Sequence, residues 1–149
     1  MTGMPPANAI AQRWIRFTIQ SQDYAVDIRS VREVLSQAVI EPVPGAPSRV
    51  LGVINLRGQI VTVLDFALWL GRGPCQAMGP LLVMDHRNTV LALAIDAVHE
   101  VTRLDPAEIK PVPRTGAGER PGTLQGLVVR DDGLLTLLDA DVLITQLAA

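Results

Sequence analysis

Cysteine, histidine and aromatic residues are scarce in this 149-residue sequence, which holds one Cys, two His, two Trp, two Phe and one Tyr. The single cysteine, Cys75, excludes an internal disulfide, and neither His86 nor His99 stands at the spacing of a metal site. With few aromatic side chains and a net charge of −2, the chain offers neither a base-stacking platform nor a basic stripe. We therefore expect no metal, no cofactor and no nucleic acid partner.

Long apolar runs are also missing. The runs 60–64 and 90–95 end at Asp65 and Asp96, far short of the roughly 18 residues that a membrane span requires. The first residues lack the basic start and the apolar core of a secretory signal. We expect a cytoplasmic protein that does not insert into a membrane. Its 48% hydrophobic residues must then be buried in one domain or kept for protein partners.

Alternating apolar and polar residues predict short β-strands from residue 14 onward. Residues 14–20 and 24–29 form a first predicted hairpin, and residues 51–66 form a second one. The second hairpin turns at Asn55-Leu56-Arg57-Gly58, where Asn and Gly suit positive φ. A further strand-like segment, 38–43, contains Pro42 and is therefore expected at a sheet edge that a partner can use.

Helices are expected to be few and short. Asp65 precedes residues 66–70 as an N-cap with Gly71 as the terminating glycine, and Asp139 stands in the same relation to a closing helix at 140–147. Ser30-Val31-Arg32-Glu33 has the spacing of a capping box, which predicts one helical turn. The segment 111–122, rich in Pro and Gly, is expected to be a surface loop.

The two halves of the sequence repeat this order of elements. Residues 24–34 match 91–101 without a gap, and residues 52–65 match 126–139 with Gly, Thr, Leu and Asp identical at four equivalent places. About ten short strands in two repeats predict an all-β fold of two five-stranded antiparallel barrels, with short helices after Asp65 and at the C-terminus. Residues 1–13 are expected to be a disordered tail, and 14–149 a single two-lobed domain.

The sequence contains few candidates for catalytic residues. Asp65 and Asp139 form a possible carboxylate pair, but a helix N-cap explains each of them better. No serine lies in a nucleophile elbow, so the sequence predicts a protein that is not an enzyme. Arg57 is either a solvated or carbonyl-binding turn residue or a polar anchor for a partner. Glu33 either completes the capping box of Ser30 or contacts a partner.

Three motifs in order resemble the CheW-type chemotaxis coupling proteins. They are Gly52-Val53-Ile54-Asn55-Leu56-Arg57-Gly58 with the following Ile60–Asp65, the upstream Tyr24–Ile28 with Val31–Val34, and the later Ile95–Val101. The resemblance covers residues 14–147, departs from the family at Thr62, where proline is usual, and implies two SH3-like lobes. It also implies a non-enzymatic adaptor that couples methyl-accepting chemoreceptors to a CheA-type histidine kinase and associates with receptor arrays through protein contacts.

By the same resemblance, two sets of residues face partners. Those expected to face the cytoplasmic tip of the chemoreceptor are Val31, Glu33, Gly52, Asn55, Arg57 and Gly58, and those expected to face the regulatory domain of the kinase are Val39, Ile40 and Val43. Two alternatives stay open: the same adaptor role in a chemosensory pathway for surface motility or second-messenger control, and a small barrel that binds a ligand or nucleotide.

Overall fold

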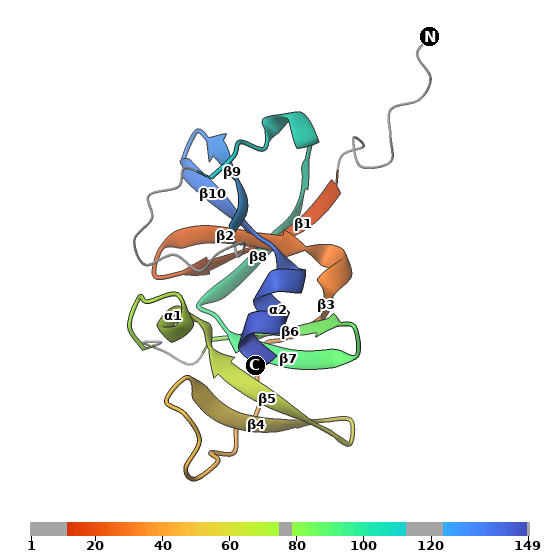
Figure 1. The fold of residues 1–149 in the computed structure, drawn as a ribbon, viewed down its shortest axis with the longest axis vertical. Helices are drawn as coiled ribbons and strands as arrows, with labels where there is room; N and C mark the ends of the chain where they lie inside the picture. The colour runs from red at the N-terminus through yellow and green to blue at the C-terminus, as the bar shows by residue number, and fades with distance from the viewer. Residues whose placement is uncertain (1–11, 75–78, 113–123, 149) are drawn as a thin grey trace.

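The computed structural model describes residues 12–74, 79–112 and 124–148, which form two lobes one above the other (Figure 1). Of the predicted tail, only Gln12 and Arg13 are described, and both belong to the first strand. The strands are β1 (Gln12–Ile19), β2 (Gln22–Asp27), β3 (Val31–Leu35), β4 (Val50–Leu56), β5 (Gln59–Asp65), β6 (Leu81–His86), β7 (Thr89–Ala94), β8 (Ala97–Leu104), β9 (Leu124–Arg130) and β10 (Gly133–Leu138). The helices are α1 (Phe66–Trp69) and α2 (Ala140–Ala148).

Each lobe is one five-stranded sheet. The upper lobe of Figure 1 has the strand order β8-β1-β2-β10-β9, and the lower lobe has the order β3-β6-β7-β5-β4. Both orders follow one pattern. Strands β1 to β5 of the first repeat correspond in sequence order to strands β6 to β10 of the second. When each strand is replaced by its counterpart, the order of one lobe becomes the order of the other. The two five-stranded, SH3-like lobes are therefore confirmed, and their matching strand orders run parallel to the repeat found in the sequence.

The repeats nevertheless do not correspond to the lobes. The first repeat supplies β1 and β2 to the upper lobe but β3, β4 and β5 to the lower one, and the second repeat does the reverse. The chain crosses between lobes at the 3₁₀ turn Ile28–Ser30 and again between β7 and β8. Each lobe is thus assembled from both halves of the sequence.

This exchange of strands creates a parallel pair in each lobe, β2 with β10 and β5 with β7. The expectation of wholly antiparallel lobes did not include these pairs, because adjacent strands from different repeats need not reverse direction. Within the described residues the ladders leave β8 and β9 as edges of the upper sheet and β3 and β4 as edges of the lower one, so hydrogen bonds do not close either barrel.

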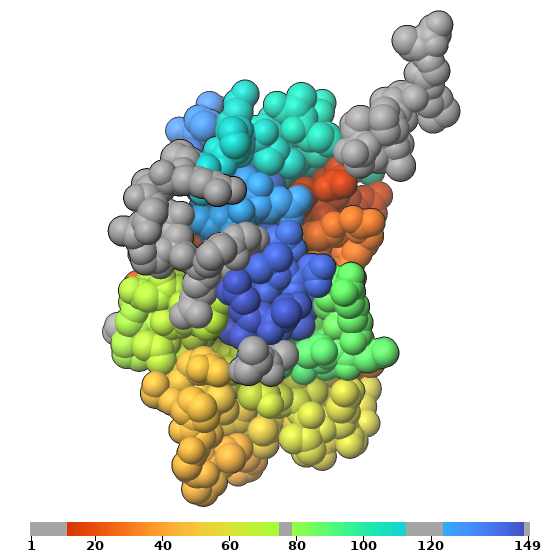
Figure 2. All heavy atoms as spheres, viewed as in Figure 1, coloured from red at the N-terminus to blue at the C-terminus, as the bar shows by residue number. Residues whose placement is uncertain are grey.

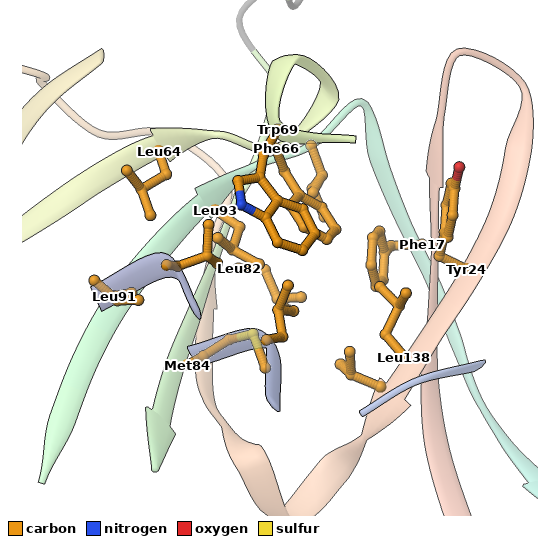
Figure 3. Close-up of a cluster of buried hydrophobic side chains, with 14 of the residues drawn as sticks. Phe17, Tyr24, Leu64, Phe66, Trp69, Leu82, Met84, Leu91, Leu93 and Leu138 are labelled. Carbon is orange, nitrogen blue, oxygen red and sulfur yellow. The ribbon is translucent and has the colours of Figure 1, made fainter. Parts of the chain in front are cut away.

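A large core between the lobes holds them together (Figure 3). Phe17, Tyr24 and Leu138 enter it from strands of the upper lobe, and Leu64, Leu82, Met84, Leu91 and Leu93 enter it from strands of the lower lobe. Each lobe also has a smaller interior of its own, centred on Trp14, Leu135 and Leu137 above and on Val61, Val63 and Val83 below. Full burial of side chains of this size contributes about 1.5–3 kcal/mol each.

Four of the five aromatic residues meet in the core between the lobes. Phe17 stacks on Tyr24 with ring centroids 5.9 Å apart and lies 6.1 Å from Phe66, which in turn stacks on Trp69 at 5.6 Å. Helix α2 adds the buried Leu143, Ile144 and Leu147 and reaches the surface between the two lobes (Figure 2). Neither helix in the described part of the chain has the length and hydropathy of a membrane span.

The predicted helix caps are confirmed. Asp65 Oδ1 accepts a hydrogen bond from the backbone N–H of Leu68 at 3.1 Å, and Asp139 Oδ1 accepts one from Val142 at 3.2 Å. Gly71 follows the C-cap residue Leu70 of the first helix and has φ +80°, as a terminating glycine requires. The two repeats therefore use the same device where a strand leads into a helix.

Two local predictions are wrong. The S-x-x-E spacing at Ser30 does not begin a helix: residues 28–30 form a 3₁₀ turn capped by Asp27, and Val31–Leu35 is strand β3. Pairing with β6 outweighs the local capping signal. The segment 38–43 forms no strand, and a single bridge joins Glu41 to Val53. The predicted loop at 111–122 lies outside the described residues beyond position 112.

Candidate protein-binding surfaces

Arg57 and Glu33 form a bidentate ion pair. Arg57 Nη1 donates to Glu33 Oε2 at 2.5 Å, and Nη2 donates to Oε1 at 3.0 Å. The hydrogen bonds from Arg57 lower the pKa of Glu33 and raise the pKa of Arg57. The Arg57 side chain remains 73% exposed. The pair therefore presents an oriented guanidinium at the surface, with its Nε–H unpartnered within the described residues.

The turn between β4 and β5 positions Arg57. Arg57 has φ +51° and Gly58 has φ +87°, which are the values of a type I′ hairpin turn. Asn55 Oδ1 accepts a hydrogen bond from the Gly58 N–H at 2.8 Å. The predicted hairpin is confirmed, but the left-handed residue beside Gly58 is Arg57 instead of Asn55. Asn55 supports the turn through its side chain.

The geometry excludes one alternative for each of the two charged residues. Arg57 binds a carboxylate and not the turn carbonyls, and Glu33 binds Arg57 instead of capping Ser30. Because Glu33 lies on β3, the ion pair joins the two edges of the lower sheet.

Residues that the sequence did not single out extend this surface. Arg32 Nη1 donates to Gln59 Oε1 at 3.1 Å, and Arg32 Nε lies 3.8 Å from Asp85 Oδ2. Ile60, paired across the hairpin with Asn55, is 65% exposed. The alternation of β5 places Ile60 on the same face as Leu64, which is buried in the core between the lobes, and only the structure reveals that Ile60 itself stays exposed.

Two of the residues expected to face the receptor are partly or fully buried. Val31 is partly buried and packs against the core between the lobes. Gly52 is buried, and a Cβ at this position would lie 2.2 Å from the carbonyl oxygen of Glu41. Gly52 thus allows the chain around Glu41 to lie against β4. Glu33, Asn55, Arg57 and Gly58 are the expected receptor-facing residues that the structure brings together.

The segment 39–43 exposes two valines. Val39 is 78% exposed and Val43 is partly exposed, whereas Ile40 packs against the interior of the lower lobe. Glu41 exchanges two backbone hydrogen bonds of 2.9 Å with Val53, which fixes the segment along β4. A shallow hollow of about 270 Å³ lies beside it, lined by Ser36, Gln37, Ala38, Ile40, Gly79 and Leu81. The segment is therefore an apolar edge anchored through β4.

Carboxylates elsewhere serve structural purposes. Glu100, the equivalent of Glu33 in the second repeat, receives hydrogen bonds from Arg16 Nε at 2.9 Å and from Arg16 Nη2 at 3.1 Å. Arg16 also donates to Asp23 at 2.7 Å. The hydrogen bonds from Arg16 are the main cause that lowers the pKa of Glu100 to about 2. No cluster of three or more potential metal ligands occurs among the described residues.

Comparison with known proteins identifies the family. The family model described as CheW-like domain matches residues 13–148. The probable chemotaxis protein CheW of Rhizobium etli is 30% identical over 134 residues, which cover 89% of this chain and 86% of that protein. The chemotaxis protein CheW of Rhizobium meliloti is 29% identical over 129 residues, which cover 85% of this chain and 83% of that protein.

A solved structure agrees with these relatives. The crystal structure of the scaffolding protein TtCheW from Thermoanaerobacter tengcongensis superposes with a TM-score of 0.77 at 26% identity, over 87% of this chain and 90% of that one. The sequence and the overall fold thus agree along nearly the whole chain. The chain belongs to the family of proteins with a CheW-like domain.

Proposed function

We propose that this protein is a non-enzymatic scaffold that couples chemoreceptors to a CheA-type histidine kinase in chemotaxis. The relatives reported above carry chemotaxis names, and the structural neighbour is called a scaffolding protein. The protein acts in the cytoplasm and reaches the membrane through its receptor partners. Asp65 and Asp139, the carboxylates that most resembled a catalytic pair, serve as helix caps.

The receptor tip binds at the Arg57 surface, formed by Glu33, Asn55, Arg57 and Gly58. Arginine is enriched at binding hot spots because its planar head makes several directed bonds while its stem packs on apolar groups. Here the ion pair with Glu33 holds that head in place before a partner arrives. Pre-ordering the side chain lowers the entropic cost of association.

The regulatory domain of the kinase binds along the segment 39–43. Val39 and Val43 offer apolar contact. A single β-bridge, between Glu41 and Val53, joins the backbone of this segment to the sheet. Such an edge accepts another β-structured protein. Both proposed surfaces belong to the lower lobe, so one rigid sheet holds the two partners at a fixed separation.

The observation that carries the proposal is that one strand, β4, supports both surfaces. Gly52 of β4 supports the chain beneath the kinase-facing edge, and Asn55 at the other end of β4 supports the turn that carries Arg57. When two partners bind one rigid element, each association raises the local concentration of the other. Coupling then requires no chemical step.

A ligand-binding role receives less support. Two hollows lined by described residues measure about 270 and 200 Å³ and are open to solvent. Ligand pockets usually measure about 300–1,000 Å³ and enclose most of the ligand. The lobe interiors are filled by side chains such as Val63 and Leu137.

Reconstitution tests the proposal. The purified protein is mixed with the CheA-type kinase and a soluble chemoreceptor tip from the same cells, and the mixture is separated by size-exclusion chromatography. A complex of all three, together with a changed rate of kinase autophosphorylation, is expected. The kinase mixed with the receptor tip alone is the control. The proposal would be refuted if the three-protein mixture gave no complex beyond that of the control and the rate of kinase autophosphorylation did not change.

A further inference from the structure

Two neighbouring residues of β3 hold the tip of the β4–β5 hairpin. Glu33 accepts the two hydrogen bonds from Arg57, and Arg32 Nη1 donates to Gln59 Oε1 at 3.1 Å. Because Gly58 lies between Arg57 and Gln59 in the chain, the two bridges attach on either side of the turn glycine. Side chains thus join the tip to β3 twice, although within the described residues no ladder of backbone hydrogen bonds joins β3 to β4 or β5.

A β-bulge directs both residues of β3 toward the hairpin. On the ladder between β3 and β6, Val31 pairs with Met84. Glu33 pairs with Val83, the residue directly before Met84, so Arg32 is an extra residue between two paired ones. Consecutive residues on a regular strand point to opposite faces of the sheet, but a bulge breaks this alternation and re-aims side chains. Arg32 and Glu33 can therefore both reach the tip.

The upper lobe has a bulge at the equivalent place and uses it differently. Between two successive paired positions, β8 holds His99 and Glu100 whereas β1 holds only Arg16. His99 and Glu100 are the counterparts of the β3 pair in the sequence repeat. His99 Nε2 lies 3.2 Å from Thr18 Oγ1, and Glu100 binds Arg16, so both contacts go to the adjacent strand β1. In the lower lobe the same pair of positions reaches across to a hairpin tip instead.

We propose that Arg32 is a positioning residue for the receptor-facing arginine. Through Gln59 it fastens the hairpin tip to β3, and this second bridge keeps Arg57 within reach of Glu33. Each bridge is exposed and weak by itself. Once one bridge has formed, the other closes at a high effective concentration, so the two together restrict the tip more than either does alone. Asp85, whose Oδ2 lies 3.8 Å from Arg32 Nε, orients the Arg32 side chain from β6.

This inference rests on the proposed function, because the arginine that is positioned is the one assigned to the receptor. Arg57 contacts the receptor tip, and Arg32 acts through Arg57. Order in the free hairpin lowers the entropic cost of binding, and loss of that order raises it. Loss of Arg32 should therefore weaken receptor binding less than loss of Arg57 does, and only while Arg57 is present.

Side-chain relaxation in the free protein tests the positioning step without any partner. Nitrogen-15 NMR measures the order parameter of the Arg57 Nε–H group in the wild type and in the variants. We expect a clear decrease in Arg32→Ala and in Gln59→Ala, and recovery in Arg32→Lys, which keeps a donor. Arg29→Ala is the matched control, because Arg29 is 78% exposed and pairs with Asp27 in its own turn. An order parameter that stays at the wild-type value in Arg32→Ala would overturn the proposal.

Titration with the receptor tip separates positioning from direct contact. Arg32→Ala should weaken binding about two- to fivefold, the cost of ordering one flexible side chain. In a chain that already carries Arg57→Ala, it should weaken binding no further. An equal loss in both backgrounds would show that Arg32 contacts the receptor itself, and the positioning role would then be wrong. Thermal melting close to that of the wild type confirms that each variant is folded.

The two measurements also distinguish this inference from the proposed function. If the receptor tip does not bind the wild-type protein, the proposed function is refuted, and the relaxation of Arg57 alone decides whether Arg32 positions it. If the tip binds and Arg32→Ala changes neither the order parameter nor the affinity, the proposed function stands and the role of Arg32 is refuted.

Discussion

Arg57 and Glu33, 24 residues apart in the sequence, meet through two parallel hydrogen bonds of 2.5 and 3.0 Å. One lies on a hairpin turn and the other on the opposite edge strand of the same sheet. Because the pair is largely exposed, it adds little to folding stability. Its larger effect is to restrict the side chain that we assign to receptor binding.

Replacement of this arginine should therefore affect binding more than stability. We expect Arg57→Ala to leave the melting temperature almost unchanged and to weaken binding of the receptor tip about tenfold or more, as loss of an interface anchor does. Kinase binding should stay as in the wild type. Isothermal titration with each partner measures both effects.

Arg87 provides a matched control for Arg57. It also lies in a two-residue hairpin turn at φ +51°, and its side chain is 79% exposed. Arg87→Ala should leave receptor binding unchanged. Equal loss in both variants would mean that general surface charge, and not the Arg57 surface, attracts the receptor.

An acidic residue at the apolar edge should weaken binding of one partner, the kinase, without affecting binding of the other, the receptor. We expect Val39→Asp to weaken kinase binding by about tenfold while receptor binding persists, because the kinase interface would then bury an unpaired charge. Val129→Asp, at a valine of similar exposure in the upper lobe, is the control. A kinase that binds Val39→Asp normally would place its contact elsewhere on the protein.

A side chain at Gly52 should disturb the kinase-facing edge from beneath. Its Cβ would meet the Glu41 carbonyl oxygen at 2.2 Å, whereas a Cβ at Gly133, also at positive φ, would meet nothing within 4 Å. Gly133→Ala therefore isolates the cost of positive φ. We expect Gly52→Ala to destabilise the protein by about 1–3 kcal/mol more than Gly133→Ala and to weaken kinase binding. Equal unfolding free energies in urea would contradict this steric explanation.

The ion pair of Glu100 with Arg16 predicts a dependence of stability on pH. The pKa of Glu100 falls from its usual 4.5 to about 2 in the folded protein, so its stabilisation is complete above about pH 4.5 and is lost as the pH falls toward 2. Solvent screening limits the cost of Glu100→Gln to about 0.2–1 kcal/mol at pH 7. Denaturation at pH 7 and at pH 2 should give a difference between variant and wild type only at the higher pH.

Exchange of strands between the repeats predicts that the lobes unfold together. Leu137 belongs to the interior of the upper lobe and Leu81 to that of the lower lobe. Leu137→Ala and Leu81→Ala should each lower the stability by about 2–5 kcal/mol and shift one shared transition. Calorimetry that resolves two transitions in either variant would indicate separate folding units.

Much of the local structure could be predicted from the sequence. The turn at Arg57-Gly58, the aspartate caps at Asp65 and Asp139, and the duplicated order of strands all follow from short-range rules or from self-similarity. Each depends on contacts between residues close in the sequence. The duplication and the number of short strands then predicted two five-stranded lobes, and the resemblance to the CheW-type proteins added that these lobes are SH3-like.

What could not be predicted depends on contacts between residues distant in the sequence. The spacing at Ser30 predicted a capped helical turn, but Val31–Leu35 pairs with β6 as a strand. The segment 38–43 was expected to be a strand, but it forms only one β-bridge, at Glu41. The pairing of Glu33 with Arg57 required the tertiary arrangement that brings β3 and the β4–β5 turn together. The close approach of Gly52 to Glu41 required the path of a loop that has no periodic pattern.

The interleaved repeats also suggest how such a molecule arose. Two half-length chains that traded strands would form a symmetric homodimer with the same pair of sheets, and joining the end of one chain to the start of the other would convert that dimer into this single polypeptide. After such a fusion the halves are free to diverge. One half now ends its long hairpin in a cation and the other in two anions, a difference that identical subunits never permit.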